Sequence, residues 1–197
     1  MSARDIMLKA VAGNQPDLTP LPDEGSLELT DGDHVSAFIA LLEGIGGQVI
    51  RVNSYAEIEH YIRSTFTGED RVVTTCPQLT FYRDEAPGKP HALFDVDLAV
   101  LESDLAVAEN GAVWIANLSE RVTPFICQHL AVIVAPSAIV ADLHHAYDKI
   151  ASMDYDFGVF IAGPSKTADI EQSLVLGAHG PKTMTVFLFQ ADSFPAH

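Results

Sequence analysis

Residues 157–189 read FGVFIAGPSKTADIEQSLVLGAHGPKTMTVFLF, and this stretch indicates the fold more clearly than any other part of the chain. The apolar run at 157–162 is typical of a buried strand, and a second apolar run at 184–189 is typical of another. Between them, a turn rich in Gly, Pro, Ser and Thr leads into residues 169–176, for which we expect a helix. Open α/β sheets bind ligands in turns at the carboxyl ends of buried strands, so function is expected here.

The same alternation of apolar runs and helical patterns extends over most of the chain. Helical spacing of apolar residues predicts helices at 35–42, 57–66 and 140–150. Asp33 and Ser54 stand where they can cap the first two. Short apolar runs predict strands at 48–52, 71–75, 112–116 and 130–135, and the pattern from residue 70 onward, with further apolar pieces at 98–101 and 105–108, is dominated by strands. Continuous apolar strands that alternate with helices are typical of an α/β protein whose sheet is covered on both faces.

The first 33 residues differ from the rest of the chain because they are rich in Pro, Asp and Gly. This composition predicts a flexible N-terminal arm over 1–33, with one helical turn at 6–11, followed by a single domain over 34–197. Of the 197 residues, 48% are hydrophobic and 19% are charged. That is enough apolar material for a full core, which argues against global disorder.

The chain is strongly acidic, with 11 Lys and Arg against 27 Asp and Glu and a net charge of −16. This charge argues against binding to nucleic acids and anionic membranes, because both bind basic patches on proteins. No apolar stretch reaches the ~20 residues of a membrane span, and no basic-then-apolar leader opens the sequence. We therefore expect a cytoplasmic protein without membrane insertion.

The chain has only two cysteines, Cys76 and Cys127, which are far apart in the sequence. An iron–sulfur cluster is usually held by four thiolates, so this chain is not expected to ligate one by itself. Two cysteines also argue against a disulfide framework, and each is expected to be a small buried hydrophobe. His144 and His145 would face apart on a helix, so no metal site is expected.

The turn after the strand at 157–162 concentrates polar and charged groups, namely Gly163, Ser165, Lys166, Thr167, Asp169 and Glu171. It lacks the spacing of both a P-loop and a dinucleotide fingerprint. In one interpretation, Ser165 or Thr167 caps the expected helix and the acidic residues occupy its first turns. In the other, the hydroxyls, the lysine and backbone amides bind a small carboxylate or phosphate, and the two acidic residues act as bases or bind sugar-type hydroxyls.

A second group of interest is Glu109-Asn110-Gly111. Asn and Gly tolerate positive φ, so a tight hairpin turn is one interpretation. The other is an exposed carboxylate that acts as a nucleophile or general base. His179 and His129 are further titratable candidates. We expect Glu109, Asp169 and His179 to act in catalysis, and Asn110 and the turn at Gly163 to bind ligand, in one cleft at the carboxyl ends of the strands.

Gly-Pro-Ser-x-Thr-Ala-Asp-Ile-Glu at 163–171, then Gly-x-His-Gly-Pro at 177–181 and a closing apolar strand, resembles the signature of the LUD domain. More narrowly, the chain resembles the lactate utilization protein C family, most strongly over 95–190. Two departures indicate a divergent branch. The family's Ala-Glu-Thr-Gly-Thr is Ala-Glu-Asn-Gly-Ala at 108–112 here, and its Pro-Pro before a buried His is Ile126-Cys127 ahead of His129.

The resemblance implies a three-layer αβα sandwich related to sugar-phosphate isomerases and coenzyme A transferases. It also implies a three-component system that oxidises L-lactate to pyruvate, in which the other two components carry the iron–sulfur motifs. In such a system this chain would be the accessory, cluster-free subunit. It would bind no cofactor of its own, and its partners would be the two iron–sulfur subunits.

Glu-Asn-Gly at 109–111 is also similar to the Ser-Glu-Asn-Gly motif of class I coenzyme A transferases, in which the Glu is the nucleophile. Ala108 stands here in place of the Ser. Two alternatives therefore accompany the accessory subunit. One is a coenzyme A transferase-like enzyme that uses Glu109, and the other is a module that binds a small anion without catalysis.

Overall fold

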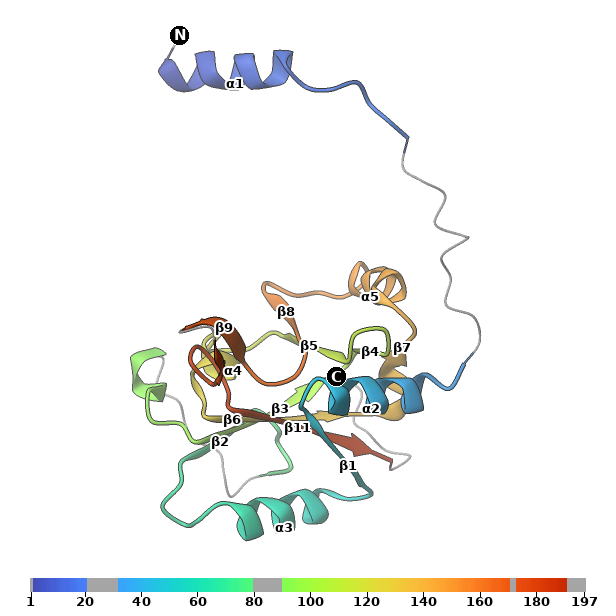
Figure 1. The fold of residues 1–197 in the computed structure, drawn as a ribbon, viewed down its shortest axis with the longest axis vertical. Coiled ribbons are helices and arrows are strands. Elements are labelled where there is room, and N and C mark those ends of the chain that lie inside the picture. The colour runs from blue at the N-terminus through green and yellow to red at the C-terminus, as the bar shows by residue number, and fades with distance from the viewer. Residues whose placement is uncertain (1, 21–31, 80–89, 171–172, 191–197) are drawn as a thin grey trace. The chain divides into compact units, whose positions relative to one another are not determined.

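A computed structural model of the chain describes residues 2–20, 32–79, 90–170 and 173–190 (Figure 1). The chain divides into two units, Met1–Thr30 and Asp31–His197. The described residues of the first unit form the helix α1 (Ala3–Gly13), which has no buried residue. Ser2 and Asp5 form a capping box at its start, with each side chain accepting a hydrogen bond from the other residue's amide. This cap explains why the helix exceeds the single turn predicted at 6–11.

The second unit is built around a five-stranded parallel sheet with the strand order β1-β11-β6-β3-β2. Its strands are β1 (Gln48–Val52), β2 (Val72–Thr74), β3 (Leu98–Ser103), β6 (His129–Val134) and β11 (Thr183–Phe189). The three inner strands are almost continuously buried, as parallel strands covered on both faces must be. The apolar runs in the sequence predicted β6 and β11, and β3 begins at the apolar piece at 98–101.

Helices α2 (His34–Gly44) and α3 (Tyr55–Thr65) lie on the two faces of this sheet (Figure 1). The described residues also form the helices α4 (Thr123–Ile126) and α5 (Leu143–Ile150), with 3-10 turns at Pro90–Leu93 and Pro136–Ala138. Ile58 of α3 packs in one cluster with Ile133, whereas Phe38 of α2 packs in another cluster with Val132. Neighbouring residues of a strand point to opposite faces, so α2 and α3 cover opposite faces. Within the described ranges, no helix has the length and hydropathy needed to cross a membrane.

A smaller sheet with the order β7-β4-β5-β8 is formed by β4 (Ala106–Val107), β5 (Ala112–Ala116), β7 (Ile139–Val140) and β8 (Gly158–Ile161). One of its faces joins the core that α2 and the parallel sheet share, through Val113 and Ile115. Its other face, including Trp114, packs with Ile150 of α5. The predicted α/β class and αβα sandwich are confirmed. One outer layer is α3, and the opposite layer is formed by α2 together with the small sheet. Helix α5 covers the outer face of the small sheet.

Local signals placed the first helices correctly. Asp33 Oδ1 accepts a hydrogen bond from the amide of Ser36 at 3.0 Å, and Ser54 Oγ accepts one from the amide of Glu57 at 3.3 Å. The helix predicted at 140–150 begins later, because Asp142 caps it and the residues before it form β7.

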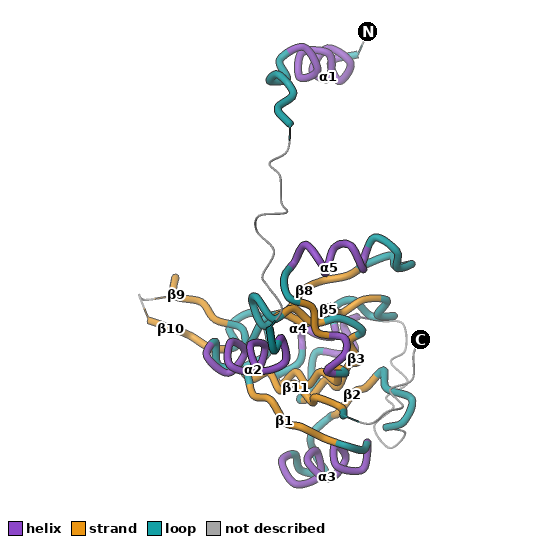
Figure 2. Tube along the Cα trace, turned by 90° about the vertical axis from the view of Figure 1, so that its right-hand side faces the viewer, coloured by secondary structure: helices purple, strands orange, loops and turns teal. Residues whose placement is uncertain are grey.

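The helix predicted over 169–176 is wrong. Residues 166–176 instead contribute β9 (Lys166–Ile170) and β10 (Ser173–Leu176), which pair antiparallel as a separate two-stranded sheet that extends outward (Figure 2). Leu174 and Leu176 are 66% and 49% exposed, whereas Val175 between them is half-buried. This two-residue period is that of a strand, and the β-branched Val175 favours it.

Candidate functional site

The turn at Gly163 follows β8 and packs on the end of α2. Gly163 has a φ of +70°, and a Cβ there would lie 3.1 Å from Cγ1 of Ile45. The Lys166 ammonium donates a hydrogen bond to the Ile45 carbonyl. No helix begins at this turn, because the chain continues into β9, so neither Ser165 nor Thr167 caps a helix. The expected anion site loses the helix-terminal amides on which it depended.

The turn at Gly163 lies directly against the turn at 177–181. The amide of Ser165 donates to the Pro181 carbonyl at 2.9 Å, and the amide of Gly177 donates to the Ser165 carbonyl at 3.0 Å. Gly180 has a φ of +141°, and a Cβ there would lie 3.1 Å from Cβ of Ser165. The structure therefore brings together the two segments that carry the sequence motif.

The other expected residues of this region have different surroundings. His179 is exposed, and Thr167 is half-buried in β9. Asp169 lies in β9 as well, in the strand rather than at the start of a helix. Glu171 lies outside the described residues.

Glu109, Asn110 and Gly111 form a tight turn between β4 and β5. Asn110 Oδ1 accepts a hydrogen bond from the amide of Ala112 at 3.0 Å, and Gly111 has a φ of +67°. Glu109 Oε2 accepts a hydrogen bond from the amide of Leu143 at 3.1 Å. The hairpin interpretation of this motif thus describes the geometry, and the carboxylate stabilises the start of α5.

The turns at Gly111 and Gly163 lie at the same end of the small sheet, because β5 pairs antiparallel with both β4 and β8. A Cβ at Gly111 would lie 3.2 Å from Cα of Leu42, so both turns approach α2. Both turns follow the carboxyl ends of strands, β4 and β8, as expected, but these strands belong to the small sheet and not to the parallel sheet. The Glu109 carboxylate contacts the start of α5, whereas the Gly163 turn contacts the end of α2.

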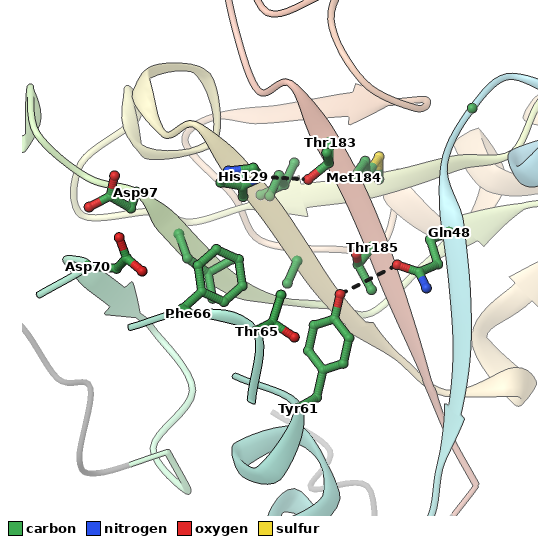
Figure 3. Close-up of a pocket in the computed structure, with 14 residues that line it drawn as sticks. Gln48, Tyr61, Thr65, Phe66, Asp70, Asp97, His129, Thr183, Met184 and Thr185 are labelled. Atoms are coloured by element: carbon green, nitrogen blue, oxygen red, sulfur yellow. Dashed lines mark hydrogen bonds between the residues drawn. The ribbon is translucent and has the colours of Figure 1, made fainter. Parts of the chain in front are cut away.

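A cavity of about 430 Å³ opens at the amino ends of the parallel strands, and we call it the His129 pocket. Figure 3 shows its side chains. They come from the starts of β1, β3, β6 and β11, from the end of α3, and from the segment between α3 and β2. The lining residues are Gly46, Gln48, Tyr61, Thr65, Phe66, Asp70, Asp97, Leu98, His129, Leu130, Ala131, Thr183, Met184 and Thr185.

His129 is the central titratable group of this pocket. Its Nδ1 lies 2.8 Å from Oγ1 of Thr183. The Phe66 ring packs edge-on against the imidazole, with 5.4 Å between the two ring centroids. Burial and the nearby Lys182 hold the pKa of His129 below its usual value, although Asp97 and Asp70 oppose them. The imidazole is therefore neutral near pH 7, and the nitrogen that does not face Thr183 can exchange a proton or a hydrogen bond with a ligand.

Each of the two carboxylates of the pocket accepts hydrogen bonds from the protein through only one of its oxygens, among the described residues. Asp97 Oδ2 accepts a hydrogen bond from the amide of Arg71 at 2.8 Å, and Asp70 Oδ2 accepts one from Oγ1 of Thr67 at 3.0 Å. Across the pocket, the Tyr61 hydroxyl donates to Oε1 of Gln48 at 3.4 Å (Figure 3). Of these pocket residues, only His129 was a candidate from the sequence, because the others come from segments that only the fold brings together.

Both cysteines are buried, as expected, and they lie in the clusters on opposite faces of the parallel sheet. Burial raises the pKa of the Cys76 and Cys127 thiols to about 12. Among the described residues, no group of three or more His, Cys, Asp or Glu side chains could hold a metal ion.

Comparisons with known proteins point to one family. The family model of the LUD domain matches residues 83–189. A lactate utilization protein C from Shouchella clausii is 34% identical over 92 residues, which are 43% of this chain and 40% of that protein. A lactate utilization protein C 1 from Bacillus mycoides is 38% identical over 93 residues, with the same coverage. The chain thus spans about 40% of the length of these curated relatives.

The fold is similar to that of a solved structure. The crystal structure of a DUF162 family protein from Deinococcus radiodurans matches with a TM-score of 0.58 at 17% identity. The match covers 82% of this chain and 99% of the solved chain. At this identity the likeness extends to the fold alone, and it agrees with the αβα sandwich.

Proposed function

This chain belongs to the LUD domain family, and from that premise we propose that it acts in lactate utilization. The observation that carries the proposal is the match of residues 83–189 to the family, together with relatives named lactate utilization protein C. The matched segment ends with β11, and it includes the inner strands of the parallel sheet and the whole small sheet.

Within that role, the chain is an accessory subunit that holds no iron–sulfur cluster, and it works in the cytoplasm with two iron–sulfur subunits that oxidise L-lactate to pyruvate. The cysteine inventory supports this division of labour. The sequence contains two cysteines, whereas a cluster is usually held by four thiolates. Both thiols are buried with a pKa of about 12, so neither presents a thiolate near neutral pH.

A coenzyme A transferase-like enzyme is the less well supported alternative. That chemistry requires the Glu109 carboxylate to attack an acyl group. Its Oε2 instead accepts the Leu143 amide, and Asn110 beside it serves the hairpin turn. A carboxylate that satisfies a helix amide is less available as a nucleophile.

Co-purification tests the accessory role. The full chain would be tagged in the organism that encodes it, and cells would be grown on L-lactate or, as a control, on glucose. We expect two iron-containing, coloured proteins to co-purify from the lactate-grown cells and the eluate to oxidise L-lactate. The chain produced alone would be colourless and inactive. Turnover of L-lactate by the chain alone would overturn the accessory role.

A further inference from the structure

We propose that the His129 pocket binds a small neutral ligand that carries several hydroxyl groups. The inference does not rest on the proposed role in lactate utilization. Lactate is an anion, whereas the ligand proposed here is neutral.

The pocket has the size and construction of a ligand site. Its volume of about 430 Å³ lies within the range of about 300–1,000 Å³ that small-molecule sites occupy. Four strands of the parallel sheet supply much of its lining, so most of the wall is rigid. Sites on strands hold their groups more firmly than sites on loops.

Thr185 supplies the observation that points to a ligand. Its side chain lines the pocket near the Tyr61–Gln48 pair (Figure 3), and the residue is only 7% exposed. Within the described part of the chain, the Thr185 hydroxyl makes no hydrogen bond. Because this hydroxyl opens onto the pocket, it can donate a hydrogen bond to a ligand there and accept one from it.

The remaining polar groups offer both kinds of hydrogen-bonding partner. The second carboxylate oxygens of Asp70 and Asp97 can only accept, and within the described residues neither has another hydrogen bond. The His129–Thr183 pair can donate or accept, depending on the tautomer. A hydroxyl group does both, whereas a carboxylate ligand only accepts and an ammonium group only donates. The inventory therefore matches hydroxyl groups better than either ion.

The charges around the pocket also favour a neutral ligand. Asp70 and Asp97 repel an anion. Two nearby lysines repel a cation. Lys182 is close enough to His129 to lower the pKa of that imidazole. The Lys166 ammonium lies near Gly46, a residue of the pocket lining, because a Cβ added at Gly46 would be 3.3 Å from Nζ of Lys166. The lysines oppose the charge of the two carboxylates, although neither lysine lines the pocket, which weakens the attraction of a cation. The Tyr61 and Phe66 rings provide apolar walls for the carbon face of a polyol.

Ligand-observed NMR titration of the full chain tests the proposal with four probes. Myo-inositol and erythritol are neutral polyols, L-lactate is an anion, and ethanolamine is a cation that carries one hydroxyl. We expect a neutral polyol to bind and the two ions to bind more weakly or not at all. Binding of L-lactate or ethanolamine in preference to both polyols, or no binding by either polyol, overturns the proposal.

Variants locate the binding. Thr185→Val removes the hydroxyl at nearly constant volume, and we expect it to weaken polyol binding about tenfold. Thr75→Val is the matched control, because Thr75 is exposed at the opposite end of the sheet. If Thr185→Val fails to fold, Thr183→Val removes the partner of His129 and serves the same purpose. Unchanged polyol affinity in the folded variant overturns the assignment.

Discussion

The Glu109 carboxylate accepts a hydrogen bond from the backbone amide of Leu143 at 3.1 Å. The side chain after β4 thereby satisfies the first amide of α5, which has no partner within its own helix. Asp142 caps the same helix by accepting from the amide of His145 at 2.9 Å. Two carboxylates thus stabilise one helix start, which gives Glu109 a structural reason to be a carboxylate.

We expect Glu109→Gln to change the free energy of unfolding by less than about 0.5 kcal/mol, because the amide oxygen can still accept the Leu143 proton. Glu109→Ala removes the acceptor and should cost about 1 kcal/mol in urea unfolding. Equal destabilisation by both variants would contradict this account.

Wild-type protein incubated with an acyl-coenzyme A should carry no mass adduct on the Glu109 peptide, and such an adduct would revive the transferase alternative.

Gly158 lies directly under Trp114 across the β5–β8 pair, and a Cβ there would be 2.0 Å from Cζ2 of the indole. Gly158→Ala should therefore destabilise the protein by about 1–3 kcal/mol through overpacking. Gly44→Ala is the control, because a Cβ at Gly44 meets no atom within 4 Å. The control should be neutral or slightly stabilising. Urea unfolding followed by fluorescence of Trp114, the single tryptophan of the chain, distinguishes the two variants.

The buried cysteines should be chemically silent in the folded protein. Burial raises the pKa of both thiols to about 12, so at pH 8 only about 10⁻⁴ of each is thiolate. Iodoacetamide should leave Cys76 and Cys127 unmodified in the native state and label both in urea, as measured by mass spectrometry. Native labelling as fast as labelling in urea would show that the thiols are accessible.

His129 should make the folded protein less stable at mildly acidic pH. Its pKa is lowered in the folded state, chiefly by burial. The unfolded state then binds more protons, so stability rises with pH through this window. The contribution of neutral His129 to the stability of the folded state is fully present above its pKa in the unfolded state, about 6.5. This contribution is lost as the pH falls toward the lower pKa of His129 in the folded state. His129→Asn should flatten the dependence of unfolding free energy between about pH 5.5 and 7.5. Parallel wild-type and variant curves would contradict the assignment.

Features that depend on neighbours in the sequence were predictable. The strands at Gln48–Val52 and Ala112–Ala116 begin and end where their apolar runs do, and Asp33 and Ser54 cap the helices that follow them. The α/β class follows from the same signals, because a continuous apolar run needs cover on both faces.

Features that depend on distant partners were not predictable in the same way. The run Ser173–Leu176 is apolar enough for a helix or a strand, and pairing with β9 decides between them. The run at 157–162 does form a strand, but its membership of the small sheet depends on pairing with β5. The His129 pocket joins segments from Gly46 to Thr185, and no local pattern indicates that they meet.

Growth on L-lactate as the sole carbon source tests the central claim most directly. The gene for this chain would be deleted in its own organism, and the deletion would be complemented with either the wild-type gene or Glu109→Gln. The account predicts that the deletion strain grows normally on pyruvate but fails on L-lactate, and that both complementing genes restore growth. Normal growth of the deletion strain on L-lactate would contradict a role in lactate utilization.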